Sequence, residues 1–184
     1  MTSANQLTIL RMVSVPLFVL LIVYDYIGGA FMVFVLAGLT DLLDGFIARR
    51  FGQKTPLGTF LDPIADKLLI MSSFIVLSID GLELVVKIPA WLTITVIGRD
   101  ILLVISVMII NLAIEKRLFS PSVFGKATTF IQLVTVFVVM LLSYLKLEFS
   151  GVTMLFYATF VLTVISGLHF LASGMTIFGD VGEE

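Results

Sequence analysis

The sequence predicts an all-α, polytopic membrane protein with six transmembrane helices in one bundle. Hydrophobic residues make up 59% of the 184 residues, and only 13% are charged. A soluble domain has about 45–50% apolar and roughly 25% charged residues, so this chain has too few polar side chains to cover a water-exposed surface. Its mean hydropathy is +1.17, and we expect most of its surface to face lipid.

Six apolar runs divide the chain, and each reaches the roughly 20 residues that a helix needs to cross a bilayer core about 30 Å thick. The predicted spans are Leu7–Ile27, Gly29–Arg49, Gly58–Ile79, Pro89–Ala113, Val123–Leu145 and Val152–Phe178. Turn-like or charged breaks separate them at Gly28–Gly29, Arg50–Leu57, Asp80–Ile88, Ile114–Ser122 and Lys146–Gly151. Because no repeat or long linker interrupts the pattern, we expect residues 1–184 to form a single domain.

Basic residues concentrate in the loops that follow the second and fourth spans. These loops hold Arg49, Arg50, Lys54, Lys116, Arg117 and Lys126, whereas the connections on the opposite side hold Lys87 and Lys146. Since cytoplasmic loops carry the excess of Lys and Arg, we expect both basic loops to lie in the cytoplasm.

The remaining composition excludes several classes of function. Eleven Lys and Arg against thirteen Asp and Glu leave no basic excess for a nucleic-acid backbone. The chain has no cysteine and one histidine, His169, which we expect to be a partnered residue of the bundle. Any bound metal must therefore be a hard cation held by oxygen.

Seven ionisable residues fall inside the predicted spans, where each costs about 2.5–3.5 kcal/mol at the helix centre. They are Asp41, Asp44, Asp62, Asp66, Lys67, Arg99 and Asp100. So many charges indicate function, although adjacent Arg99 and Asp100 could also serve only to join helices. The roles of Lys67 and Asp100 stay open.

The four aspartates are spaced to share a site. Asp41 and Asp44 stand at i and i+3 of one span, and Asp62 and Asp66 at i and i+4 of the next, so each pair occupies one helix face. If the two spans pack antiparallel, the pairs meet, and clustered carboxylates in a low dielectric must either protonate or recruit cations. Oxygen ligands favour Mg²⁺, Mn²⁺ or Ca²⁺, and four carboxylates can hold two such ions, as in phosphoryl displacement.

Small residues accompany the aspartates: Gly45, Ala48 and Gly58 leave room for a bulky group, or they serve close helix packing. Arg49 ends the second span and could contact a phosphate or anchor the helix at the cytosolic surface.

The stretch from Asp41 to Arg49 reads Asp-Leu-Leu-Asp-Gly-Phe-Ile-Ala-Arg, and Gly-Thr-Phe-Leu-Asp-Pro-Ile-Ala-Asp follows eight residues later. It resembles the signature of the CDP-alcohol phosphatidyltransferases, Asp-x₂-Asp-Gly-x₂-Ala-Arg-x₈-Gly-x₃-Asp-x₃-Asp, with every fixed position present. The resemblance covers essentially the whole chain and implies a six-helix membrane enzyme, commonly a homodimer. Together with the small size of the chain, it favours a bacterial plasma membrane.

The resemblance also implies a role for each motif residue. Asp41, Asp44 and Asp62 hold two divalent ions, usually Mg²⁺ or Mn²⁺, and Asp66 lies at the same metal site as general base. Gly45, Ala48, Arg49 and Gly58 line the cytidine diphosphate pocket. The reaction displaces CMP from a CDP-activated lipid such as CDP-diacylglycerol and leaves a new phosphodiester.

Other pieces of the chain concern the acceptor alcohol. The segments Asn5–Arg11, Gly98–Asp100 and Gly125–Thr128 resemble bacterial phosphatidylglycerophosphate synthases of this family, which use glycerol 3-phosphate. Arg99, Lys126 and, more weakly, Arg11 are the candidates for binding its phosphate. Lys126 could instead be a helix-end lysine that reaches the interface.

Two departures leave a second acceptor open. Ala4 stands where those synthases commonly have proline, and Asp100 stands where they usually have glutamate. The run from Ala37 to Arg49 also resembles the cardiolipin synthases of the same family, whose acceptor is phosphatidylglycerol. Outside the family, a small cation transporter is the rival, because intramembrane aspartates also mark ion pathways.

Overall fold

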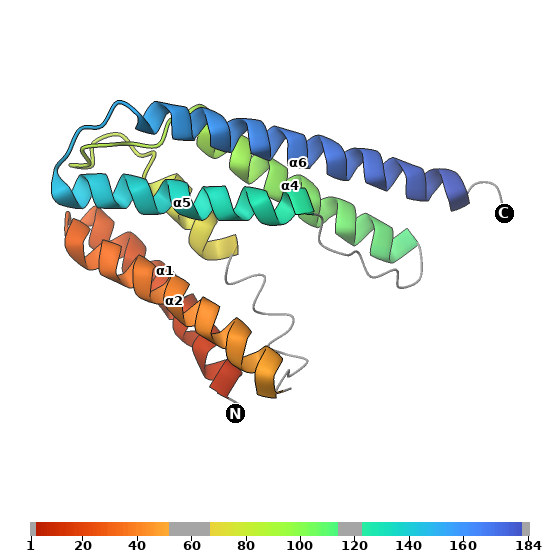
Figure 1. The fold of residues 1–184 in the computed structure, drawn as a ribbon, viewed down its shortest axis with the longest axis horizontal. Coiled ribbons are helices and arrows are strands. Elements are labelled where there is room, and N and C mark those ends of the chain that lie inside the picture. Colours follow the sequence, from red (N-terminus) through yellow and green to blue (C-terminus); the bar gives the residue numbers. More distant parts are fainter. Residues whose placement is uncertain (1–2, 52–66, 114–122, 182–184) are drawn as a thin grey trace. The chain divides into compact units, whose positions relative to one another are not determined.

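The computed structural model describes residues 3–51, 67–113 and 123–181, and the side chains of residues 11–40, 67–105 and 124–172. All regular structure in these ranges is helical, which confirms the all-α prediction. The helices are α1 (Ser3–Val23), α2 (Ile27–Phe51), the helix Lys67–Val76, α4 (Ala90–Ala113), α5 (Val123–Leu145) and α6 (Val152–Val181) (Figure 1).

Two of the described helices are long and apolar enough to cross a membrane. They are Phe124–Leu145, within α5, and Val152–Ala172, within α6. The described residues also contain three shorter apolar helical segments, which are Arg11–Val23, Ile27–Thr40 and Lys67–Val76. The arrangement with six spans therefore stays a prediction.

The chain divides into two compact units, and α5 contributes to both. The first unit contains α1, α2, the helix Lys67–Val76 and the half of α5 from Val136 onward; the second contains α4, the half of α5 up to Thr135, and α6. A single domain over residues 1–184 remains our prediction.

In the first unit, α1 and α2 pack side by side (Figure 1) around aromatic side chains. Phe18 of α1, fully buried, lies 6.0 Å from Phe34 of α2, measured between ring centroids. Phe31 of α2 lies 5.4 Å from Phe137 and 5.9 Å from Tyr144, both on α5. The contacts of Phe31 link the two segments of the sequence that form this unit, Met1–Ile88 and Val136–Phe149.

The turn between α1 and α2 is not where the glycine pair predicts it. Asp25 carries the turn, with a left-handed φ of 58°. The amide of Tyr26 donates to the carbonyl of Leu21 (2.8 Å), and the amide of Asp25 donates to that of Ile22 (3.0 Å), which is the Schellman pattern of a helix end. Gly28 and Gly29 lie inside α2, so the predicted break at these residues was wrong.

The other boundaries that fall in the described residues agree with the predicted spans to within a few residues, and the predicted start at Gly58 lies outside them. The bounds of α5 are those predicted, and α4 and α6 begin within one residue of their predicted starts. α6 continues three residues beyond the predicted end at Phe178. The described helix that includes Lys67 ends at Val76 rather than at the predicted Ile79.

Candidate functional site

The first half of the acidic motif lies on α2. This helix is continuous from Ile27 to Phe51, so Asp41, Asp44, Gly45 and Ala48 follow at i, i+3, i+4 and i+7 and share one helical face. Arg49 lies one residue further along the same helix. The backbone thus has the regular helical form that the predicted carboxylate pair requires.

The second half of the motif lies outside the described residues. Gly58, Asp62 and Asp66 fall in the range 52–66, and the side chains of the α2 motif residues are likewise outside the description. Within the described side chains, no three acidic or histidine residues come together. The metal assignment therefore rests on donor chemistry, because four carboxylates suit a hard divalent cation.

Arg99 and Asp100 form a buried ion pair on α4. Nη1 of Arg99 donates to Oδ1 of Asp100 at 2.8 Å, and the two side chains are 7% and 2% exposed. The structure thus buries this ion pair within the second unit, where the opposite charges offset each other. Because both partners lie on α4, this ion pair does not itself join two helices, which was the structural interpretation of these adjacent charges.

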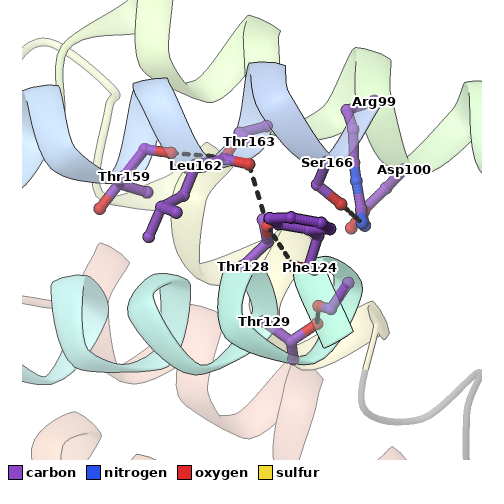
Figure 2. Close-up of polar contacts among 10 residues, drawn as sticks. Arg99, Asp100, Phe124, Thr128, Thr129, Thr159, Leu162, Thr163 and Ser166 are labelled. Atoms are coloured by element: carbon purple, nitrogen blue, oxygen red, sulfur yellow. Dashed lines mark hydrogen bonds and ion pairs between the residues drawn. The ribbon is translucent and has the colours of Figure 1, made fainter. Parts of the chain in front are cut away.

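The guanidinium of Arg99 also contacts Ser166, a residue of α6. Its hydroxyl accepts a hydrogen bond from Nη2 of Arg99, and Figure 2 shows the serine side chain directed at the guanidinium. Ser166 is 1% exposed. Ser166 was not singled out from the sequence, because the spacing of polar residues on one helix does not show that a serine contacts an arginine of another helix.

Buried hydroxyl groups continue along the same helices. The hydroxyl of Thr128 on α5 donates to the carbonyl of Leu162 on α6 (3.1 Å), and the hydroxyls of Thr135 and Thr159 lie 2.7 Å apart (Figure 2 shows the first contact). These bonds register α5 against α6 within the second unit. The signal was visible in the sequence as polar residues at i, i+4 and i+7 on both helices: Thr128, Gln132 and Thr135, and Thr159, Thr163 and Ser166.

Gln132 differs from these neighbours. Its side chain is fully buried, yet neither the amide nitrogen nor the amide oxygen has a hydrogen-bond partner in the part of the chain that the structure describes. Burying an amide without hydrogen-bond partners costs free energy of folding. Gln132 is therefore expected to destabilise the packing of α5 against α6.

The other predicted basic residues lie in different environments. Arg11 of α1 is 2% exposed, whereas Lys126 is exposed in the first turns of α5. Lys67 is half-buried in the described helix Lys67–Val76. His169, on α6, is exposed and lies 4.9 Å from the ring of Phe124. An exposed Lys126 agrees with a helix-end lysine that reaches the interface.

Comparison with known proteins identifies the family. The sequence profile of the CDP-alcohol phosphatidyltransferases matches residues 1–169. The chain belongs to this family. It is therefore a phosphatidyltransferase of phospholipid biosynthesis, and the resemblance of the motif between Asp41 and Asp66 is confirmed as a family relationship.

Individual relatives extend over most of the chain. A "probable phosphatidylglycerophosphate synthase" of Mycobacterium tuberculosis is 35% identical over 97% of this chain and 84% of its own length. A "CDP-diacylglycerol--glycerol-3-phosphate 3-phosphatidyltransferase" of Escherichia coli is 33% identical over 91% of each chain. A "cardiolipin synthase (CMP-forming)" of Streptomyces coelicolor is 36% identical over 78% of this chain and 66% of its own length.

Membership in the CDP-alcohol phosphatidyltransferases also bears on cofactor and location. Enzymes of this family generally use divalent metal ions and are associated with membranes, and the two apolar helices within α5 and α6 agree with the second property.

Proposed function

We propose that this enzyme transfers a phosphatidyl group from CDP-diacylglycerol to glycerol 3-phosphate and releases CMP. The observation that carries the proposal is the near full-length match to relatives named for this activity, which reaches 97% of this chain in one relative and 91% of both chains in another. The cardiolipin synthase of Streptomyces matches over a smaller share of both chains. Nothing within the family relationship favours a cation transporter.

The acidic quartet is our proposed metal site. Asp41, Asp44, Asp62 and Asp66 would hold two Mg²⁺ or Mn²⁺ ions, since carboxylate oxygens are the ligands that these ions prefer. When bound, such ions neutralise the pyrophosphate and stabilise the charge that develops on CMP. The helical face shared by Asp41 and Asp44 on α2 supports the first half of this site.

The remaining motif residues bind and activate the substrates in this proposal. Gly45, Ala48, Arg49 and Gly58 line the cytidine diphosphate pocket. Asp66 accepts the proton of the acceptor hydroxyl; the acceptor oxygen bonds to the phosphatidyl phosphorus, and the bond from that phosphorus to the CMP oxygen breaks. A base must lie within about 2.6–3.2 Å of the proton-bearing oxygen for this role.

Arg99 is the proposed anchor for the acceptor phosphate, with Lys126 and Arg11 as secondary candidates. A guanidinium suits a phosphate because its planar N–H groups match two phosphate oxygens. Arg99 is 7% exposed and has Nε without a partner among the described residues, so it retains donors for a ligand.

We further propose that one domain with six spans places the catalytic site toward the cytoplasm of a bacterial plasma membrane, in a homodimer. The six basic residues of the two loops on one side, against two on the other, support this orientation. Acyl chains then stay in the lipid, while the nucleotide reaches water.

The test is an assay with purified enzyme in detergent, CDP-diacylglycerol and either glycerol 3-phosphate or phosphatidylglycerol, in which CMP and the lipid product are measured. We expect CMP release with glycerol 3-phosphate and phosphatidylglycerophosphate as product. Asp66→Asn is expected to abolish the reaction, whereas Asp80→Asn, at an exposed loop residue, serves as the matched control. Turnover with phosphatidylglycerol alone would assign the enzyme to the cardiolipin synthases.

A further inference from the structure

The guanidinium of Arg99 is held from two sides, by two different helices. Nη1 donates to Asp100, the next residue on α4, and Nη2 donates to Ser166 on α6. All three side chains are at least nine-tenths buried. The bond to Ser166 spans 67 residues of sequence, so it depends on how α4 and α6 pack in the second unit.

The donors of Arg99 are not exhausted by these two bonds. A guanidinium carries five N–H groups in one plane. One bond each from Nη1 and Nη2 leaves Nε–H and a further N–H on each terminal nitrogen, and Nε has no partner among the described residues although it is buried. A phosphate monoester, with several charged oxygens, is the ligand that such a planar edge recognises best.

α6 contacts Arg99 at its stem as well as at its tip. A Cβ built on Gly167 would lie 3.5 Å from Cγ of Arg99, so the backbone of α6 runs beside the aliphatic stem while Ser166 binds the end of the side chain. Asp100 is the next residue on the same helix. The bond to Asp100 by itself would leave the guanidinium free to rotate about the bonds of the long arginine side chain. Ser166 supplies the second fixed point that determines the plane of the guanidinium.

We propose that Ser166 is a positioning residue, which orients Arg99 so that its remaining N–H edge faces the phosphate of the acceptor. This inference rests on the proposed function, because it assumes that glycerol 3-phosphate is the acceptor. Ser166 does not touch the acceptor itself, and it acts only through Arg99.

The experiment measures KM and kcat for both substrates in Ser166→Ala. Because the lost bond concerns orientation of a phosphate-binding group, KM for glycerol 3-phosphate is expected to rise on the order of tenfold, with kcat and the KM for CDP-diacylglycerol near wild type. Ser166→Thr keeps the hydroxyl and is expected to restore the KM. Ser166→Cys, whose sulfur is a weak acceptor, gives the same rise as alanine and serves if the alanine variant does not fold.

Thr163→Val is the matched control. Thr163 lies on the same helix, is fully buried, and its hydroxyl donates only to the carbonyl of Thr159 at 2.7 Å. This variant removes a buried hydroxyl of α6 without touching Arg99, so its KM values are expected to stay at wild type even if its stability falls.

The outcomes separate the inference from the proposed function. If wild-type enzyme uses glycerol 3-phosphate and Ser166→Ala leaves its KM unchanged, Ser166 is only a contact between helices and the inference fails while the function stands. If Ser166→Ala and Thr163→Val change KM equally, the inference fails as well. If the wild-type enzyme does not accept glycerol 3-phosphate, the proposed function fails, and the inference fails with it.

Discussion

A Cβ atom on Gly28 would lie 2.9 Å from Cε2 of Tyr144, closer than carbon atoms approach in folded proteins. The first turn of α2 therefore packs directly against the ring of Tyr144, which in turn stacks on Phe31 with ring centroids 5.9 Å apart. The glycine serves close packing within the first unit, as small residues do in membrane helices.

Gly28→Ala and Gly29→Ala are expected to change stability in opposite directions. Alanine in place of a helical glycine gains roughly 0.5–1 kcal/mol. A Cβ on Gly29 meets Leu21 at an ordinary 3.5 Å, so Gly29→Ala keeps this gain. Gly28→Ala must displace the Tyr144 ring, and overpacking costs about 1–3 kcal/mol. Thermal unfolding in detergent compares the variants; equal shifts would show that Tyr144 moves aside freely.

This pair of glycines shows what the sequence could and could not predict about the fold. The bounds of α5 followed from the apolar run between Val123 and Leu145. The break at Gly28–Gly29 did not, because glycine suits both a turn and a close contact, and only the packing partner decides. Asp25 gave only a weak signal, since aspartate adopts the left-handed conformation more often than most residues but far less often than glycine.

The end of α5 offers a direct test of backbone strain. Lys146 has a φ of 54°, and the amides of Lys146 and Leu147 donate to the carbonyls of Ser143 and Leu142 in a second Schellman pattern. A left-handed conformation costs a residue with a Cβ roughly 1–2 kcal/mol, so Lys146→Gly is expected to raise the unfolding temperature. Lys146→Ala removes the same side chain but keeps the Cβ. An equal gain in both variants would assign the effect to the lysine side chain.

Gln132→Met is expected to stabilise the protein. The amide of Gln132 is buried without a partner among the described residues, and removing such an unsatisfied group recovers on the order of 1–3 kcal/mol. Methionine keeps the unbranched shape. Thr135→Val, one turn away, is the comparison: it breaks the 2.7 Å contact with Thr159 and should lower stability. Loss of stability in Gln132→Met would mean that the amide does have a stabilising partner.

Site residues could be predicted from the sequence where they are consecutive or regularly spaced. The adjacency of Arg99 and Asp100 indicated either function or charges that find partners on neighbouring helices, whereas the structure pairs the two residues with each other on α4. Ser166 could not be found in this way, because the relative register of α4 and α6 depends on packing. The meeting of the carboxylates on α2 with Asp62 and Asp66 stays a prediction.

Metal removal tests the proposed quartet. EDTA is expected to abolish CMP release, and Mg²⁺ or Mn²⁺ to restore it, because the proposed ions would neutralise the pyrophosphate and stabilise the charge on the departing CMP. Asp41→Asn removes one proposed ligand and should weaken Mn²⁺ binding by more than about tenfold, since even changes around a ligand cost 10–100-fold. Asp25→Asn, in the turn before α2, is the control. Mn²⁺ binding is measured by calorimetry; unchanged affinity in Asp41→Asn would remove this residue from the metal site.

Asp100→Asn tests whether an acceptor phosphate reaches Arg99. Removing one partner of a buried ion pair costs about 3–5 kcal/mol, because the other charge stays behind uncompensated, so the variant should unfold at a lower temperature. A bound phosphate supplies new negative charge, and glycerol 3-phosphate should therefore raise the unfolding temperature of Asp100→Asn more than that of wild type.

The exposed pair of Asp80 and Lys87, 3.9 Å apart, gives the comparison for this experiment. Asp80→Asn should change neither the unfolding temperature nor its response to glycerol 3-phosphate, because exposed ion pairs contribute little. Glycerol, which lacks the phosphate, should not rescue Asp100→Asn. Equal stabilisation of wild type and Asp100→Asn by glycerol 3-phosphate would place its phosphate away from Arg99.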